Sequence, residues 1–213
     1  PRLRGLLDRI QSEGLGEFAA VHGYFPCFSR GNTLVVLDPE DHTSVRACFD
    51  FPRQPSGKRL CLADYFRDEQ ETADLGPDVL GMQLVTMGSK VSQTTAELYA
   101  LNSYREYLEL HGLSVQLAEA TAELIHHRIR AELGFADQDG PVAEQLEHQA
   151  YRGSRYSFGY PACPDLEMRA PLCELLAPAR IGVHLSEEFQ LDPEQSTDAI
   201  VIHHPQAKYF STR

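Results

Sequence analysis

Basic residues are scarce in this chain of 213 residues, which carries 19 Lys and Arg against 31 Asp and Glu and has a formal net charge of −12. Nucleic-acid binding draws on clusters of Lys and Arg that replace condensed counterions. The sequence has no basic stripe of that kind, so we expect no nucleic-acid partner. An acidic field would instead attract cations.

Long apolar runs and paired cysteines are also missing. No run approaches the eighteen or more residues of a membrane span, and the first residues lead into an amphipathic segment instead of a signal peptide. The five cysteines are an odd number without Cys-x-x-Cys spacing, which indicates neither a disulfide framework nor a structural zinc site. We therefore expect a cytoplasmic protein with reduced thiols and no membrane contact.

What the chain does have is the composition of an ordered globular protein, with 42% hydrophobic and 23% charged residues. Its length permits one sizeable core, and it contains no internal repeat or low-complexity tract. We expect a single domain over residues 1–213.

Periodicity and turn signals place strands toward both ends of the chain and helices between them. An opening helix is expected over residues 3–10. Aromatic and β-branched residues predict strands over 18–28, 33–37, 45–51, 79–86, 199–202 and 208–210, and another from Val183 onward.

The middle of the sequence is strongly helical. We expect one helix over 94–110, ended by His111 and Gly112, and a second that Ser114 caps and that ends near Gly134. Shorter helices are expected over 142–151 and 168–176. Strands and helices that segregate along the chain indicate an α+β fold with antiparallel strands.

The most distinctive stretch is Arg-Tyr-Ser-Phe-Gly-Tyr-Pro-Ala-Cys-Pro at residues 155–164. A rigid loop with aromatic walls and the bidentate donor Arg155 suits a small molecule that carries a carboxylate and a flat ring. Gly159 permits a backbone conformation that a side chain would disfavour. The alternative is that Arg155 only ties the loop to a neighbouring carboxylate.

This stretch resembles the signature loop of the activation (reactivation) domain of cobalamin-dependent methionine synthase, the C-terminal module that binds S-adenosylmethionine. The similarity extends through residues 62–66, 117–120 with the following His126, 181–183 and 204–209. The resemblance implies that family's α+β fold, a twisted antiparallel sheet with a central helical segment. It also implies that residues 1–213 are a fragment of a larger multidomain enzyme.

The resemblance assigns binding roles to individual residues. Arg155 would hold the carboxylate of S-adenosylmethionine and Asp64 would receive its ammonium group. The backbone around Ser157 and the ring of Tyr160 would frame the adenosyl part, with Tyr209 nearby. Without the resemblance, Asp64 would be interpreted as a helix cap or surface residue and Tyr209 as a core residue.

The helical pattern and the resemblance disagree about Glu119. In the family the matching glutamate lies near the sulfonium. On a helical wheel, however, the apolar stripe predicts a solvated Glu119; the stripe comprises Leu117, Ala118, Thr121, Leu124 and Ile125, and the opposite face holds Glu119, Glu123, His126 and Arg130. Both statements hold only if the polar face of this helix lines the pocket.

Gln149 is a departure from the family, which often has a second glutamate at this position. A neutral amide supplies no charge to a sulfonium, so the counter-charge would depend on Glu119 or on aromatic faces.

Neither a metal site nor a catalytic side chain is expected. The histidine pairs at 126–127 and 203–204 lack partners at metal-binding spacing. Cys163 has no local base that would make it a nucleophile.

The resemblance implies a function in methionine biosynthesis. The domain would present the methyl group of S-adenosylmethionine for reductive methylation of inactive cob(II)alamin, with an electron from flavodoxin or a flavoprotein reductase. The chain lacks the Asp-x-His-x-x-Gly signature of the cobalamin-binding domain, so cobalamin would arrive on another domain of the same polypeptide. The domain would then belong to a methyltransferase and act by proximity and orientation.

Two alternatives stay open. The chain could be a stand-alone module that binds S-adenosylmethionine or docks a corrinoid protein without turnover. It could also be an unrelated hydrolase that uses Cys163.

Overall fold

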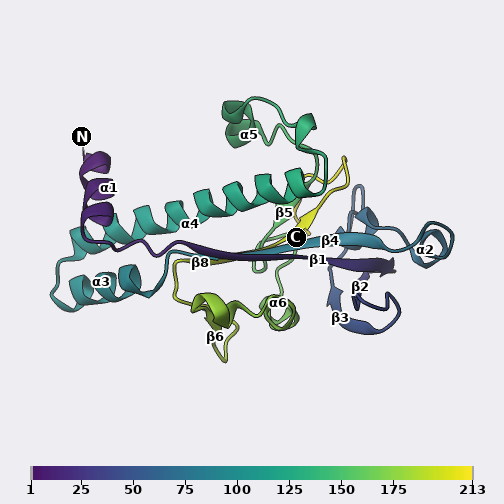
Figure 1. The fold of residues 1–213 in the computed structure, drawn as a ribbon, viewed down its shortest axis with the longest axis horizontal. Helices are drawn as coiled ribbons and strands as arrows, with labels where there is room; N and C mark the ends of the chain where they lie inside the picture. Colours follow the sequence, from purple (N-terminus) through teal and green to yellow (C-terminus); the bar gives the residue numbers. More distant parts are fainter. Residues whose placement is uncertain (1, 213) are drawn as a thin grey trace.

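An antiparallel sheet of six strands forms the middle of the molecule in a computed structural model that describes residues 2–212 (Figure 1). The strands are β1 (Ala19–Arg30), β2 (Thr33–Leu37), β3 (Val45–Asp50), β4 (Asp78–Thr86), β5 (Ser154–Tyr156) and β8 (Ser196–Ile202). Their order across the sheet is β3-β2-β1-β4-β8-β5. The sheet therefore joins strands from both ends of the sequence.

Local sequence explains the strands at the N-terminal side. The hairpin between β1 and β2 turns at Gly31, whose φ of 64° is readily adopted by glycine. The central strand β4 is buried along nearly its whole length because both faces of the sheet are covered. Its residues Leu80, Met82 and Leu84 are fully buried in the main core.

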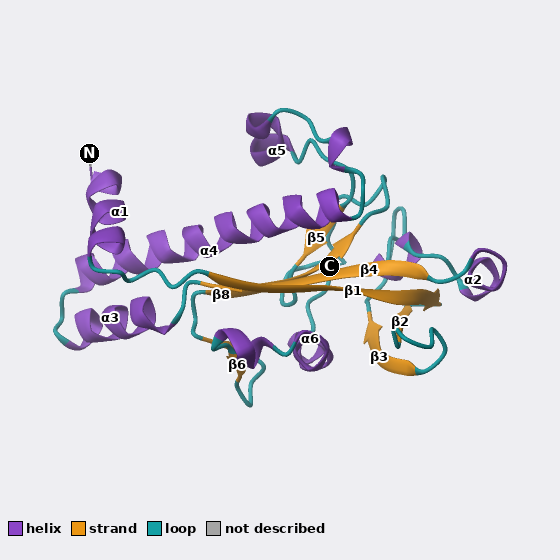
Figure 2. Ribbon diagram, in the orientation of Figure 1, coloured by secondary structure: helices purple, strands orange, loops and turns teal. Residues whose placement is uncertain are grey.

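The helices lie on both faces of the sheet and at its ends (Figure 2). They are α1 (Arg2–Ser12), α2 (Glu69–Leu75), α3 (Ser89–Ala100), α4 (Tyr104–Glu132), α5 (Val142–His148) and α6 (Arg169–Leu176). The long helix α4 follows one face, whereas α6 and the small hairpin of β6 (His184–Leu185) and β7 (Leu191–Asp192) lie on the other. Among the described residues, no helix is long and apolar enough to span a bilayer.

The prediction of an α+β fold with an antiparallel sheet is confirmed. Three details of the predicted elements are wrong. Residues 208–210 are not in a strand, the helix α2 was not predicted, and the first two residues of the signature stretch continue the edge strand β5. The strand is stabilised by pairing with β8, in the register Arg155↔Val201.

The predicted helix boundary at His111 and Gly112 is also wrong. The chain breaks earlier, at Asn102 with φ 57°, and α4 then runs without interruption to Glu132. Ser114 is not a cap: it is buried inside the helix and its hydroxyl donates to the carbonyl of His111 at 2.8 Å. One mid-helix glycine costs only about 1 kcal/mol, which the packing of a long helix can offset.

The buried face of α4 differs from the apolar stripe that the helical wheel predicted. Leu124 is 66% exposed. The buried residues of α4 are Leu110, Ser114, Ala118, Ala122, His126 and Arg130, which are spaced by four, together with Ile129. Small side chains let the helix approach the sheet closely, and Gln83 of β4 donates to the carbonyl of Ala122 at 3.0 Å. Shape and hydrogen bonding therefore decided this face, and they turn the neighbouring carboxylates of α4 toward β5.

Candidate ligand-binding pocket

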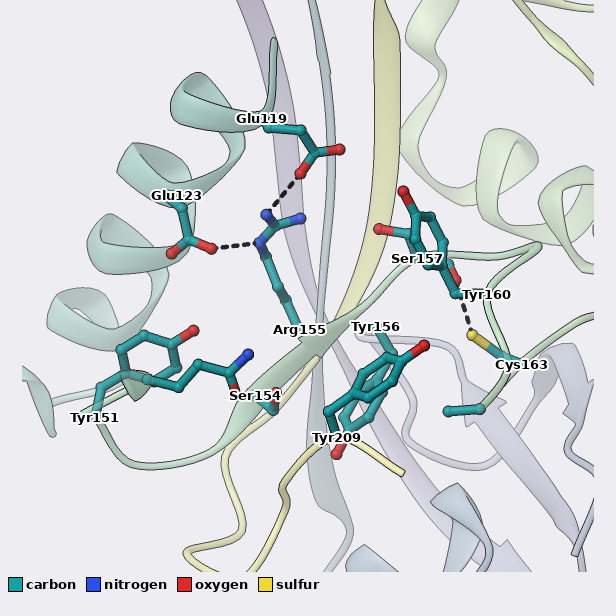
Figure 3. A pocket seen from close by; sticks show the side chains of 12 residues that line it. Glu119, Glu123, Tyr151, Ser154, Arg155, Tyr156, Ser157, Tyr160, Cys163 and Tyr209 are labelled. Carbon is teal, nitrogen blue, oxygen red and sulfur yellow. Dashed lines mark hydrogen bonds and ion pairs between the residues drawn. The ribbon is translucent and has the colours of Figure 1, made fainter. Parts of the chain in front are cut away.

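A hollow of about 560 Å³, counted out to its open mouth, lies between α4, β5 and the loop that follows β5 (Figure 3). Its lining combines charged, polar and aromatic side chains: Glu119, Glu123, Gln149, Tyr151, Ser154, Arg155, Tyr156, Ser157, Tyr160, Ala162, Cys163 and Tyr209. Four tyrosines and one guanidinium suit a ligand with a flat ring and an anionic group.

The loop after β5 owes its shape to Gly159. This residue has a φ of 92°, and its amide donates to the carbonyl of Cys163 at 2.9 Å. The amide of Cys163 in turn donates to the carbonyl of Tyr160 at 3.0 Å. These bonds close a tight turn that carries Tyr160 at its exposed tip beside the pocket.

A buried ion pair anchors the same loop to the sheet. The carboxylate of Asp198, on β8, accepts from the amide of Phe158 at 3.0 Å and from Nε of Arg169 at 2.6 Å. Arg169 also donates to the carbonyls of Phe158 and Phe189. The loop is therefore fixed to β8, to α6 and to the turn between β6 and β7.

Arg155 is the only cation that lines the hollow among the described residues. Its side chain is 16% exposed, and it donates from Nη2 to Glu119 at 2.7 Å and from Nε to Glu123 at 2.9 Å (Figure 3). Burial by itself would lower the pKa of Arg155, but the hydrogen bond to Glu119 and the charge of Glu123 raise it. The structure thus contains the ion pairs with neighbouring carboxylates that the alternative interpretation of Arg155 predicts.

The carboxylates of α4 face the hollow, where the side chain of Glu119 is 34% exposed, so the polar side of the helix lines the pocket and the helical pattern and the resemblance agree about Glu119. Burial by itself would raise the pKa of Glu123, but the ring of His126 and the guanidinium of Arg155 lower it to about 2. Nδ1 of His126 lies 3.9 Å from Glu123, beyond hydrogen-bond distance, and burial lowers the pKa of His126, so the guanidinium of Arg155 is the positive charge beside Glu123. Glu123 is therefore ionised at neutral pH.

The segment from Gln149 to Tyr151 forms another wall of the hollow. Gln149 ends α5 in a left-handed conformation with φ 51°. Lys208 holds the segment by donating to the carbonyls of Gln149 and Tyr151 at 3.1 and 3.0 Å. The ring of Tyr151 lies 4.2 Å from the guanidinium carbon of Arg130 and meets His126 edge-on. The side chain of Gln149 is exposed at this wall.

Six of the seven residues predicted from the sequence line this hollow, and Asp64 does not. Asp64 lies in a 3₁₀ helix, Leu62–Tyr65, and binds Arg53 through both oxygens, with N···O distances of 2.5 and 2.6 Å. The role of Asp64 as the partner of Arg155 around one amino acid ligand stays a prediction.

The sequence interpretation gave no site role to Glu123 or Tyr151. Glu123 follows Glu119 by four residues, so both lie on one face of the helix, and this spacing could have identified it. Tyr151 is brought in by tertiary contacts. Burial raises the pKa of Cys163 to about 12, which disfavours the thiolate that the hydrolase alternative needs.

Residues 3–213 match the family model described as "Vitamin B12 dependent methionine synthase, activation domain". The methionine synthase of Mycobacterium tuberculosis (strain ATCC 25618 / H37Rv) is 53% identical over 220 residues, and that of Mycobacterium leprae (strain TN) is 51% identical over 220 residues. Each match covers 99% of this chain and 18% of the relative. The chain thus spans less than a fifth of the length of these relatives.

A solved structure has the same fold. The crystal structure of the MetH reactivation domain bound to AdoHcy superimposes with a TM-score of 0.90 at 28% sequence identity, and the match covers 99% of this chain and 66% of that one.

Proposed function

Because the chain belongs to the family of vitamin B12-dependent methionine synthase activation domains, we propose that its hollow binds S-adenosylmethionine. The domain would present the methyl group for reductive methylation of cob(II)alamin carried on a neighbouring domain. The observation that carries the proposal is the hollow around Arg155, in a fold shared with a reactivation domain that binds AdoHcy.

The lining groups fit the chemistry of this ligand. Arg155 would bind the carboxylate, because its guanidinium is a charge-assisted donor. The exposed rings of Tyr160 and Tyr209 at the hollow can stack on the adenine, and the backbone at Ser157 would frame the adenosyl part. Glu119 would lie near the sulfonium, and the amide of Gln149 also lines the hollow.

Asp64 is proposed to receive the ligand's ammonium group, as the family resemblance implies. Its carboxylate is exposed and held by Arg53, so the ammonium would have to share or replace that ion pair. A ligand in this position would extend beyond the residues that line the hollow.

The chain's own residues need no acid or base for this reaction. The methyl group of a sulfonium is already activated, so the domain would act by holding it in line with its acceptor. Cobalamin, bound on its own domain of the same polypeptide, would supply the methyl-accepting cobalt. Flavodoxin or a flavoprotein reductase would supply the electron, and the whole methyltransferase would serve methionine biosynthesis in the cytoplasm.

Calorimetric titration of the 213-residue chain with S-adenosylmethionine and with S-adenosylhomocysteine tests the proposal. Saturable binding with one site per chain is expected for both ligands, because the carboxylate and the adenosyl group are common to them. Absence of binding by either ligand to the folded chain would reject it.

A further inference from the structure

The hollow carries an unbalanced negative charge. Its charged lining residues are one guanidinium, Arg155, and two carboxylates, Glu119 and Glu123, so the sum is −1. Gln149 contributes nothing to this balance. A single guanidinium that bridges two carboxylates can cancel only one of them, and the second charge is left for a cationic ligand.

Glu123 is the carboxylate best placed to keep that charge. It lies one helical turn from Glu119 and is half-buried, and Arg155 Nε contacts it at 2.9 Å. Its pKa of about 2 keeps it ionised over the whole physiological range. The contact uses Nε, so the terminal nitrogens of Arg155 are shared only with Glu119 among the described residues.

We infer that Glu123 is a specificity-determining residue that makes the hollow prefer a sulfonium over a neutral thioether. This inference rests on the proposed function and goes beyond it, because it assigns to Glu123 the counter-charge that a glutamate at position 149 would otherwise supply. Its consequence is that the methyl donor is held more tightly than the product left after transfer.

The charge change follows from the bond that breaks. When the S–CH₃ bond breaks, the bonding pair stays on sulfur and the methyl group leaves as the equivalent of a cation, for which a cobalt reduced by the one-electron donor would supply the accepting electron pair. The ligand's net charge therefore falls from +1 to 0. At separations of 4 to 8 Å and an effective dielectric constant of about 40, between those of bulk water and a protein surface, one such charge pair corresponds to roughly a five- to thirtyfold preference.

The test is the ratio of the dissociation constants of S-adenosylhomocysteine and S-adenosylmethionine, measured by calorimetry on the 213-residue chain. The two ligands share the carboxylate, the ammonium and the adenosyl group, so the ratio isolates the sulfonium. In Glu123→Gln, whose amide oxygen can still accept from Arg155, we expect the ratio to fall roughly five- to thirtyfold. Binding of S-adenosylhomocysteine should be retained.

Two further variants sharpen the test. Glu106→Gln removes the same charge from an exposed site on the same helix, 17 residues or about 25 Å away along the axis, and should leave the ratio unchanged. Gln149→Glu adds a carboxylate to the wall of the hollow and should raise the ratio.

If Glu123→Gln weakens the affinity for both ligands by the same factor, Glu123 only positions Arg155, and the inference is overturned. A ratio within twofold of the unmodified chain would do the same. If Glu123→Gln does not fold, an unchanged ratio in Gln149→Glu overturns it instead. Failure of the unmodified chain to bind either ligand is a different result, because it rejects the proposed function itself.

Discussion

Arg155 forms the ion pairs that the simpler interpretation of its sequence context predicts, and it lies where the proposed ligand role requires it. It is tied to neighbouring carboxylates, as the simpler interpretation expected, and it also lies in the wall of the hollow. The ion pairs hold a long side chain in one orientation before a ligand arrives. A pre-ordered guanidinium loses less conformational entropy on binding than a free one would.

Replacing Arg155 tests this role directly. Arg155→Ala should weaken S-adenosylmethionine binding by roughly 1.5 to 3 kcal/mol, the scale of a charge-assisted hydrogen bond. The binding of S-adenosylhomocysteine should be weakened more than that of S-adenosylmethionine. The two glutamates, no longer paired with Arg155, repel its carboxylate, and it has no sulfonium to offset this repulsion. Calorimetry provides the measurement. Arg128→Ala, which removes an exposed arginine paired with Glu132, is the matched control, and an unchanged affinity in Arg155→Ala would contradict the assignment.

Helix α4 is the element that builds the site. Its 29 residues extend about 43 Å along the sheet, with small buried residues against the strands and carboxylates turned toward β5. Had the helix ended at Gly112, the carboxylates would belong to a separate element with its own orientation. Continuity of α4 therefore fixes where Glu119 and Glu123 lie relative to Arg155.

Replacing a glycine by alanine should have opposite effects on stability in α4 and in the loop after β5. Gly112→Ala should raise the free energy of unfolding by about 0.5 to 1 kcal/mol, because Gly112 is exposed in mid-helix with nothing within 4 Å of an added Cβ. Gly159→Ala should lower it by about 1 to 3 kcal/mol, because its φ is 92° and the new Cβ would lie 2.8 Å from Leu166. Urea denaturation compares both with the unmodified chain. A destabilising Gly112→Ala would argue for a break in α4.

At the scale of the whole molecule, the sheet and one buried ion pair connect distant parts of the chain. β8 lies between β4 and β5, and its Asp198 receives hydrogen bonds from the signature loop and from α6. Arg169 extends this connection to the carbonyl of Phe189, beside the hairpin of β6 and β7. Loop geometry at the hollow thus depends on residues from three regions of the sequence.

Loss of this ion pair should destabilise the molecule strongly. Arg169→Ala leaves the fully buried Asp198 without its counter-charge, so the free energy of unfolding should fall by about 3 to 5 kcal/mol. The exposed pair of Arg46 and Asp38 is the comparison, since Arg46→Ala should cost at most about 1 kcal/mol. The free energies of unfolding of both variants are measured by chemical denaturation. Similar small losses in the two variants would show that the buried pair does not anchor the loop.

The sequence predicted much of the fold but not the packing of its longest helix. β1, β2 and β3 follow from aromatic and β-branched runs separated by turn residues, which are local signals. The orientation of α4 could not be predicted from hydrophobicity alone, because Ser114, His126 and Arg130 are buried beside the apolar Leu110 and Ile129, whereas Leu124 is exposed. Such a face is selected by the shape of the sheet, which only the folded chain provides.

By itself, the sequence determined the fold class, the family and six residues of the hollow, because a specific loop and local periodicities carry that information. Only the tertiary structure placed Glu123 beside Arg155, tied Asp64 to Arg53 and fixed the signature loop to β8. The physical reason is that charge balance depends on distances between residues far apart in the sequence. A carboxylate becomes part of a pocket only when the packing of its helix turns it toward the opposite wall.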